Sequence, residues 1–183
     1  MLPQREMIPA HLDFHRIAHW GEAKANAWVK GVVANFARPP AGNDTSLLKQ
    51  VASGECGVTI ANHYYYLRLQ KSKLAAEREA VGALTFVWPD QNGVGAHVNI
   101  SGGGMMKYAP HRSAAVKFLE YLASDAAQRI FTDANYEFPA VSAVPPDDAA
   151  QVLGKFKADP INVSVYGANQ TKAQMMFDRD GWR

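Results

Sequence analysis

The sequence of 183 residues predicts an α/β fold, in which short buried strands alternate with amphipathic helices. Short apolar runs bounded by turn-forming residues stand at 58–61 and 84–88. Stretches with an apolar residue every three or four positions stand on either side of these runs. Apolar residues make up 48% of the chain and charged residues 20%, so one domain can form a core, with a second partial domain beside it.

The first predicted helix covers residues 22–36. Trp28, Val32 and Phe36 stand four positions apart, which places them on one face of a helix. We expect this face to pack against a sheet.

A second helix is predicted from residue 44 onward. Asp44 or Thr45 is expected to cap its N-terminus, and Gly54 suits the position just beyond its C-terminus. The apolar run 58–61 then follows, so the order is helix, strand, helix.

Two adjacent tyrosines lie where this strand meets the next helix. Asn62 is a good N-cap, which places Tyr64 and Tyr65 in the first helical turn. Free backbone N–H groups and the helix dipole favour negative charge there, so phenolates would be stabilised. A phenolate is a hard anionic oxygen donor suited to Fe³⁺, and a bound metal would displace the phenol proton. Ferric iron is therefore the first hypothesis.

The structural alternative is an amphipathic helix start with three half-buried tyrosine rings. Tyr66 follows the pair directly, and successive helical residues point about 100° apart, so all three cannot reach one ion. Residue types alone leave this alternative open.

The rest of the chain adds a strand, a glycine bend and a helix. The run 84–88 reads as a buried strand that ends at a turn, and 98–101 as another. Gly102, Gly103 and Gly104 lack the spacing of a phosphate-binding loop and predict a bend between strands. A further helix is predicted at 111–123.

A competing class is a metal-dependent hydrolase. His11, His15 and His19 recur every four residues with Asp13 among them, so they would share one face of a helix. The glutamate of the zinc-protease motif is absent, and no Ser/His/Asp set can be assembled. We therefore expect no enzyme activity.

Composition excludes other partners. The net charge is only +2 and the basic residues are scattered, so neither nucleic acid nor direct membrane insertion is expected. The N-terminal residues show no export-signal pattern. Cys56, the single cysteine, cannot form an internal disulfide and reads as a structural thiol.

Several blocks in the same order resemble the iron(III)-binding proteins of bacterial ABC importers, with the greatest likeness to the cyanobacterial ferric-binding branch. The likeness covers the chain from about Trp28 onward. The blocks are 31–38, 42–45, 61–69, 97–102, 115–118, 135–139 and 181–182.

The resemblance implies one lobe of a periplasmic-binding-protein type II fold: a mixed sheet flanked by helices, with the first lobe largely missing. Residues 1–96 would form the second-lobe region with the tyrosines, 97–145 the return to the first lobe, and 146–183 C-terminal helices packing back on the second lobe. A helix 111–123 that packs on an absent sheet would leave apolar surface exposed.

Tyr64 and Tyr65 are the metal ligands that the resemblance carries over, and Asn62 matches a position that contacts an accompanying anion in some branches. Tyr66 stands where the family has an aliphatic residue. The implied cargo is Fe³⁺, with carbonate, citrate or another small anion.

The implied setting is the periplasm, with an ABC importer permease as partner. A homodimer or the missing first lobe would complete the structure. Two alternatives remain open: a truncated, non-catalytic remnant or interaction protein without useful iron affinity, and a binding protein for a small anion or polyamine.

Overall fold

The computed structural model describes residues 11–39 and 41–182, with side chains described from residue 15 onward. The helices of these ranges are α1 (His11–Trp20), α2 (Glu22–Ala34), α3 (Asp44–Ala52), α4 (His63–Gln70), α5 (Ala75–Gly82), α6 (Arg112–Leu122), α7 (Asp125–Asn135), α8 (Asp148–Gln151) and α9 (Ser164–Asp180).

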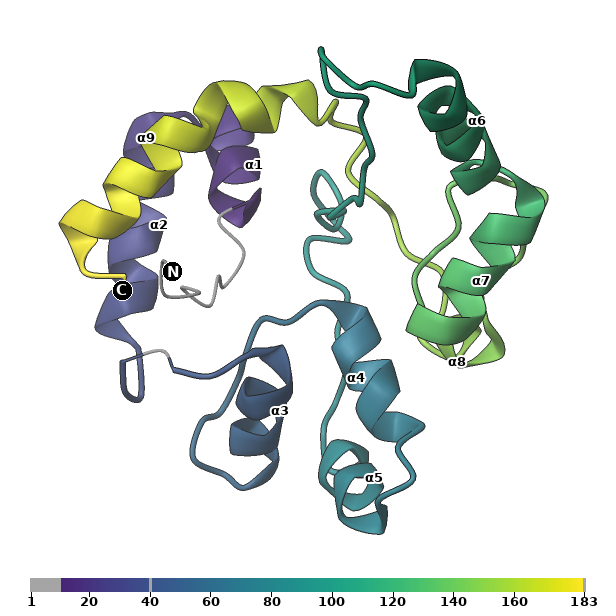
Figure 1. Cartoon of the computed structure of the whole chain (residues 1–183). Helices are drawn as coiled ribbons and strands as arrows, with labels where there is room; N and C mark the ends of the chain where they lie inside the picture. Colours follow the sequence, from purple (N-terminus) through teal and green to yellow (C-terminus); the bar gives the residue numbers. More distant parts are fainter. Residues whose placement is uncertain (1–10, 40, 183) are drawn as a thin grey trace.

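The helices form three groups (Figure 1). Helices α1, α2 and α9 pack together, so the C-terminal helix lies on the first part of the described chain. Helices α3, α4 and α5 form the second group. Helices α6 and α7 pack on each other, while α8 reaches α4 and so connects the second and third groups. None of the helices in the described ranges combines the length and apolar composition of a membrane span.

The predicted helices at 22–36, 44 onward and 111–123 are confirmed as α2, α3 and α6. The expected cap of α3 is wrong by one residue. Asn43 is the N-cap, and its side chain accepts a hydrogen bond from the Ser46 amide at 3.1 Å. Gly54 lies just beyond the helix with φ +78°, a conformation that costs glycine little.

The predicted strands do not form a hydrogen-bonded sheet within the described residues. The runs 58–61, 84–88 and 98–101 are unpaired there, and the one bridge recorded joins Ala96 to Ala158 in parallel. A strand requires a neighbour along its whole length, and the described chain places none beside these runs. Val58 is consequently 83% exposed and Val87 72% exposed.

The run 84–88 is held by side-chain packing, since it has no sheet partner among the described residues. The Trp88 ring stacks on Phe156 with the ring centroids 4.0 Å apart, and its indole N–H donates to the Leu153 carbonyl at 2.8 Å. An edge-to-face contact with Phe86 places these rings in one aromatic cluster. This cluster joins residues 84–88 to the segment that follows α8.

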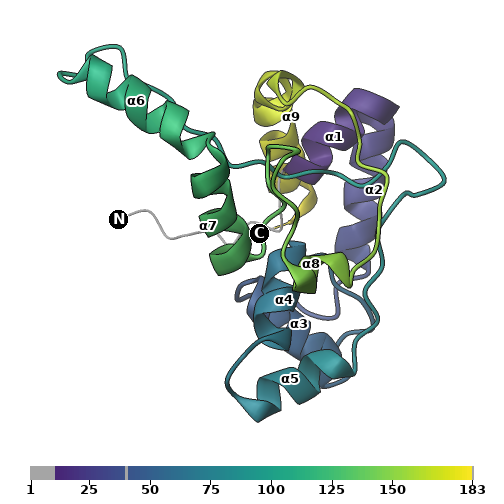
Figure 2. The same ribbon diagram turned by 90° about the vertical axis from the view of Figure 1, so that its right-hand side faces the viewer.

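Helix α6 carries the exposed apolar surface that the sequence predicts. It projects away from the other helices apart from α7 (Figure 2). Val116, Phe118 and Tyr121 on it are 41%, 59% and 48% exposed.

Two buried leucines on α4 fix that helix. Leu67 is fully buried against Ala149 and Ala150 of α8, and Leu69 packs with Leu48 of α3 and Val81 of α5. Helix α4 is therefore packed on two sides, which fixes the position of its first turn.

We expect Leu67→Ala to lower the free energy of unfolding by about 2–5 kcal/mol, because it removes buried contacts and leaves a cavity. Leu74→Ala is the matched control, since Leu74 is 63% exposed, and its effect should stay within about 0.5 kcal/mol. Urea unfolding followed by circular dichroism measures both. Equal effects of the two substitutions would contradict the packing described here.

Candidate metal site at the start of α4

The tyrosine pair lies in the first turn of α4, as the sequence predicts. Asn62 is the N-cap with extended backbone angles, φ −68° and ψ 137°, and the Tyr65 amide donates to the Asn62 carbonyl at 3.2 Å. The rings of Tyr64 and Tyr65 are half-buried, with centroids 4.6 Å apart and planes tilted by 40°. The two phenols therefore lie side by side, which one metal ion requires of a pair of ligands.

Tyr66 takes a different direction. Its ring lies 5.4 Å from that of Phe86 and packs against the two clusters that bury Leu67 and Leu69. The rotation of about 100° per residue explains why the three rings have different neighbours. Tyr65 packs against the cluster that buries Leu69, and Tyr66 packs against both clusters.

Asn62 is held by Asp44, from the first turn of α3. The Asp44 carboxylate is only 8% exposed, and its Oδ2 accepts from the Asn62 amide N–H at 2.8 Å and from the Asn62 side-chain amide at 3.2 Å. The Asn62 side-chain oxygen accepts from Asn99 at 3.5 Å. Asp44 is thus a site residue that the sequence analysis treated only as a helix cap.

The surroundings of Tyr64 disfavour its phenolate in the absence of a cation. Burial raises the pKa of Tyr64 to about 12, and the neighbouring Tyr65 phenol, Asp44 and Glu137 act in the same direction. The expectation that the helix N-terminus would stabilise phenolates is therefore wrong for this residue. The same negative groups would favour an arriving cation.

Arg68 lies one helical turn beyond the pair. Its guanidinium carbon is 5.1 Å from the Tyr64 ring centroid and 5.4 Å from that of Tyr65, within the range of cation–π attraction. The guanidinium also donates to Asn135 of α7 at 3.2 Å. Its spacing of three and four residues from the tyrosines was the sequence signal that could have identified it.

The C-terminal end of α7 lies next to α4. Tyr136 has a left-handed backbone with φ 60°, which ends the helix and leads into Glu137. The Tyr136 carbonyl lies 2.9 Å from His63 Nε2, and burial lowers the pKa of His63. The structure thereby connects residues about 70 positions apart in sequence.

Two arginines in other parts of the chain form contacts of their own. Arg38 pairs with Glu55, with 2.5 Å between Nε and Oε1. Arg112 donates to the Lys107 carbonyl at 3.3 Å, ahead of α6. Neither contact involves the tyrosine pair.

Two histidines of the predicted face, His15 and His19, lie on successive turns of α1 and share an acidic partner from another part of the chain. His15 and His19 converge on Asp159. The side chains of His11 and Asp13 lie outside the described residues. A separation of 140 residues explains why sequence spacing could not reveal Asp159.

The raised pKa of Tyr64 predicts how stability changes at alkaline pH. Because the folded chain holds the neutral phenol more tightly than the unfolded chain, this contribution to stability is complete below about pH 10 and is lost as the pH rises through about 12. We expect Tyr64→Phe to make the alkaline fall in unfolding free energy shallower. Urea unfolding at a series of pH values measures this fall. A pH profile identical to that of the unsubstituted chain would contradict the assignment.

Several known proteins are similar to this chain in sequence. Iron uptake protein A2 of Synechocystis sp. is 43% identical over 183 residues, which are 99% of this chain and 53% of that protein. The Major ferric iron-binding protein of Neisseria meningitidis is 26% identical over 156 residues, 85% of this chain and 45% of that protein. The chain thus spans about half the length of these relatives.

Solved structures extend the comparison. The Trichodesmium protein IdiA (FutA) in complex with iron and citrate superimposes with a TM-score of 0.90 at 45% identity, covering 95% of this chain and 55% of that one. The ferric binding protein from Campylobacter jejuni gives a TM-score of 0.91 at 37% identity, covering 95% and 55%. These likenesses confirm the predicted type II periplasmic-binding-protein fold class.

The family model of the bacterial extracellular solute-binding proteins matches residues 15–137. With the structural likeness, this match establishes that the chain belongs to the family of bacterial extracellular solute-binding proteins.

Proposed function

We propose that this chain binds ferric iron as part of the solute-binding component of an ABC-type iron importer, with Tyr64 and Tyr65 as phenolate ligands. The observation that supports this proposal most directly is the pair of phenol rings, whose centroids lie 4.6 Å apart in the first turn of a helix that is packed on two sides. The relatives named for ferric iron or iron uptake support the choice of cargo.

Ionisation of the phenols is coupled to the arrival of the metal. With a pKa of about 12, the Tyr64 hydroxyl is protonated at neutral pH, so Fe³⁺ must displace that proton. A trivalent cation beside two oxygen donors is a strong enough local charge to do so. Asp44 and Glu137, whose charges oppose the phenolate, attract the cation.

Two phenolates occupy only part of the coordination sphere of Fe³⁺. The remaining ligands would come from the other half of a two-lobed protein and from a small anion such as carbonate or citrate. The structure of the Trichodesmium relative with iron and citrate supports an anion of this kind. Asn62 is our candidate anion contact, because its side-chain NH2 group has two N–H donors and its recorded bond to Asp44 uses one of them.

The wider setting follows from the family. We propose that residues 1–96 belong to the second lobe, 97–145 to the return to the first lobe and 146–183 to a C-terminal segment. A first lobe or a second copy of the chain would cover α6, whose apolar side chains are exposed. The partner would be an importer permease, the location the periplasm, and the activity binding without catalysis.

The exposed apolar side chains also suit a second candidate, a non-catalytic interaction protein that keeps the lobe and lacks useful iron affinity. A small anion or polyamine as cargo is a third. Neither alternative uses the paired phenols as metal ligands, so an optical test separates them from the proposal.

We expect addition of ferric citrate to produce a visible iron–phenolate charge-transfer band. The band should weaken in Tyr64→Phe and in Tyr65→Phe and disappear in the double variant, because the transition requires a phenolate bound to iron. Visible absorption during titration, with circular dichroism to verify folding, is the measurement.

Tyr66→Phe is the matched control. It removes the hydroxyl of the next residue, whose ring packs against Phe86, so the band should remain. A folded native chain without the band, or a double variant that keeps it, would refute tyrosine ligation and leave the other two candidates.

A further inference from the structure

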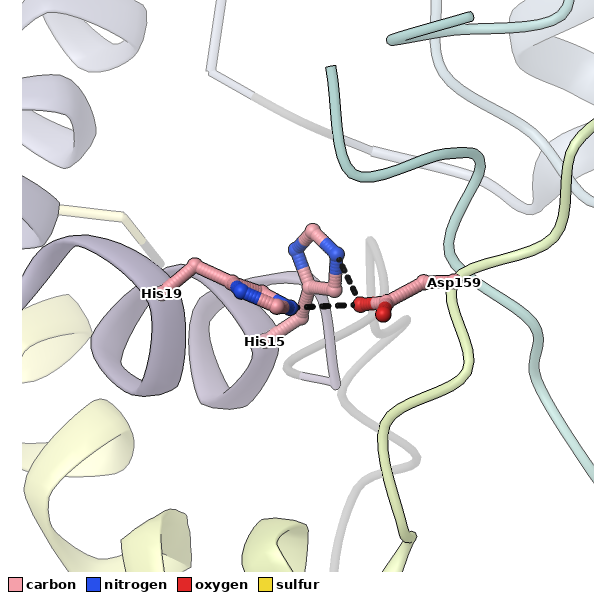
Figure 3. A group of neighbouring side chains, drawn as sticks. All are labelled: His15, His19 and Asp159. Atoms are coloured by element: carbon pink, nitrogen blue, oxygen red, sulfur yellow. Dashed lines mark hydrogen bonds and ion pairs between the residues drawn. The ribbon is translucent and has the colours of Figure 1, made fainter.

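A second group of metal-binding side chains lies apart from the tyrosines (Figure 3). His15 and His19 project from successive turns of α1, and Asp159 reaches them from the segment that precedes α9. Their ligand atoms, one from each residue, all lie within 4.8 Å of one another. His15 and Asp159 are buried, at 6% and 7% exposure, while the His19 side chain is 24% exposed.

Both histidines approach the same carboxylate oxygen. Asp159 Oδ2 lies 2.7 Å from Nε2 of His15 and 2.7 Å from Nε2 of His19 (Figure 3). The His19 contact is a hydrogen bond, whereas His15 Nε2 approaches as closely without hydrogen-bond geometry. Among the described residues, His15 Nδ1 is also buried without a hydrogen-bond partner. A buried imidazole that is poorly satisfied by hydrogen bonds calls for another partner.

The carboxylate is held in place by its own segment. Asp159 Oδ1 accepts from the Ile161 amide at 3.0 Å, which directs Oδ2 toward the histidines. The Asp159 amide donates to the Ala96 carbonyl at 2.9 Å, beside the parallel bridge of Ala96 and Ala158. Supporting bonds of this kind orient the first ligands in metal sites.

Two further side chains, those of His97 and Tyr166, lie beside the group. The His97 ring lies 5.6 Å from that of His15, centroid to centroid, and the Tyr166 hydroxyl lies 3.1 Å from His97 Nδ1. Burial raises the pKa of Tyr166 to about 12, and the charge of Asp159 adds to this effect. Burial lowers the pKa of His15.

We propose that His15, His19 and Asp159 form a binding site for one divalent transition-metal ion, such as Zn²⁺ or Co²⁺, separate from the tyrosine pair. Two imidazoles and one carboxylate match borderline divalent cations better than Mg²⁺ or Ca²⁺, which prefer all-oxygen ligand sets. Bonds of about 2.0–2.2 Å to each donor would require Oδ2 of Asp159 to move away from the two nitrogens, now 2.7 Å from it, so that the ion can lie between the three atoms.

The role of the ion would be structural. It would connect α1, packed on α2 and α9, to the loop that leads into α9. Metal binding to the folded chain would therefore stabilise this helical group.

The test uses the metal-depleted chain titrated with Co²⁺, followed by its visible d–d absorption. We expect one ion per chain and a higher unfolding temperature on binding. Asp159→Asn keeps the side-chain shape, and His19→Gln alters a partly exposed position, so both variants should fold. Each should weaken Co²⁺ binding by more than about 100-fold, since even residues outside the coordination sphere typically change affinity by 10–100-fold.

His111→Gln is the control, because His111 is exposed and lies at the start of α6, away from this group. It should bind Co²⁺ as the native chain does. The double variant Tyr64→Phe/Tyr65→Phe should also keep the Co²⁺ signal, so this test stands independently of the ferric-iron proposal. The inference is overturned if the folded native chain binds no Co²⁺, or if Asp159→Asn and His19→Gln bind it as tightly as His111→Gln.

Discussion

Burial of Leu67 and Leu69 on α4 is the constraint on which the tyrosine site depends. These two leucines face different partners, α8 on one side and α3 with α5 on the other, so they fix both the position and the rotation of the helix. Once that rotation is set, Tyr66 packs against both clusters and Tyr65 against the one that buries Leu69, while the rings of Tyr64 and Tyr65 lie side by side. The geometry of the pair is therefore a consequence of core packing, and polar contacts such as that between Asp44 and Asn62 refine it.

The helices and the place of the tyrosines could be predicted from the sequence because their signals are local. Apolar spacing, Gly54 beyond α3 and Asn62 before α4 each act within a few residues. Strand pairing depends on residues far away in the chain, and the described residues offer no neighbour to the runs 58–61 and 84–88. For the same reason the contact of Asp159 with α1 could not be predicted, because Asp159 lies far from that helix in the sequence.

The electrostatics of the tyrosine pair differ from the sequence-based expectation for a clear reason. A helix N-terminus contributes only partial charges, and these fall off within one turn. Desolvation of a half-buried ring and the nearby carboxylates of Asp44 and Glu137 outweigh that effect at Tyr64. The metal-free Tyr64 phenol is thus neutral, with the carboxylates of Asp44 and Glu137 near it. Such an arrangement resists ionisation in isolation and accommodates it together with a multivalent cation.

The unpaired runs have a consequence for handling the chain. Val58, Val87 and Ile100 expose apolar side chains next to backbone groups that have no strand partner among the described residues. Open backbone edges combined with apolar side chains are templates for strand addition by another chain. Association of this polypeptide with itself through these runs should therefore increase with its concentration.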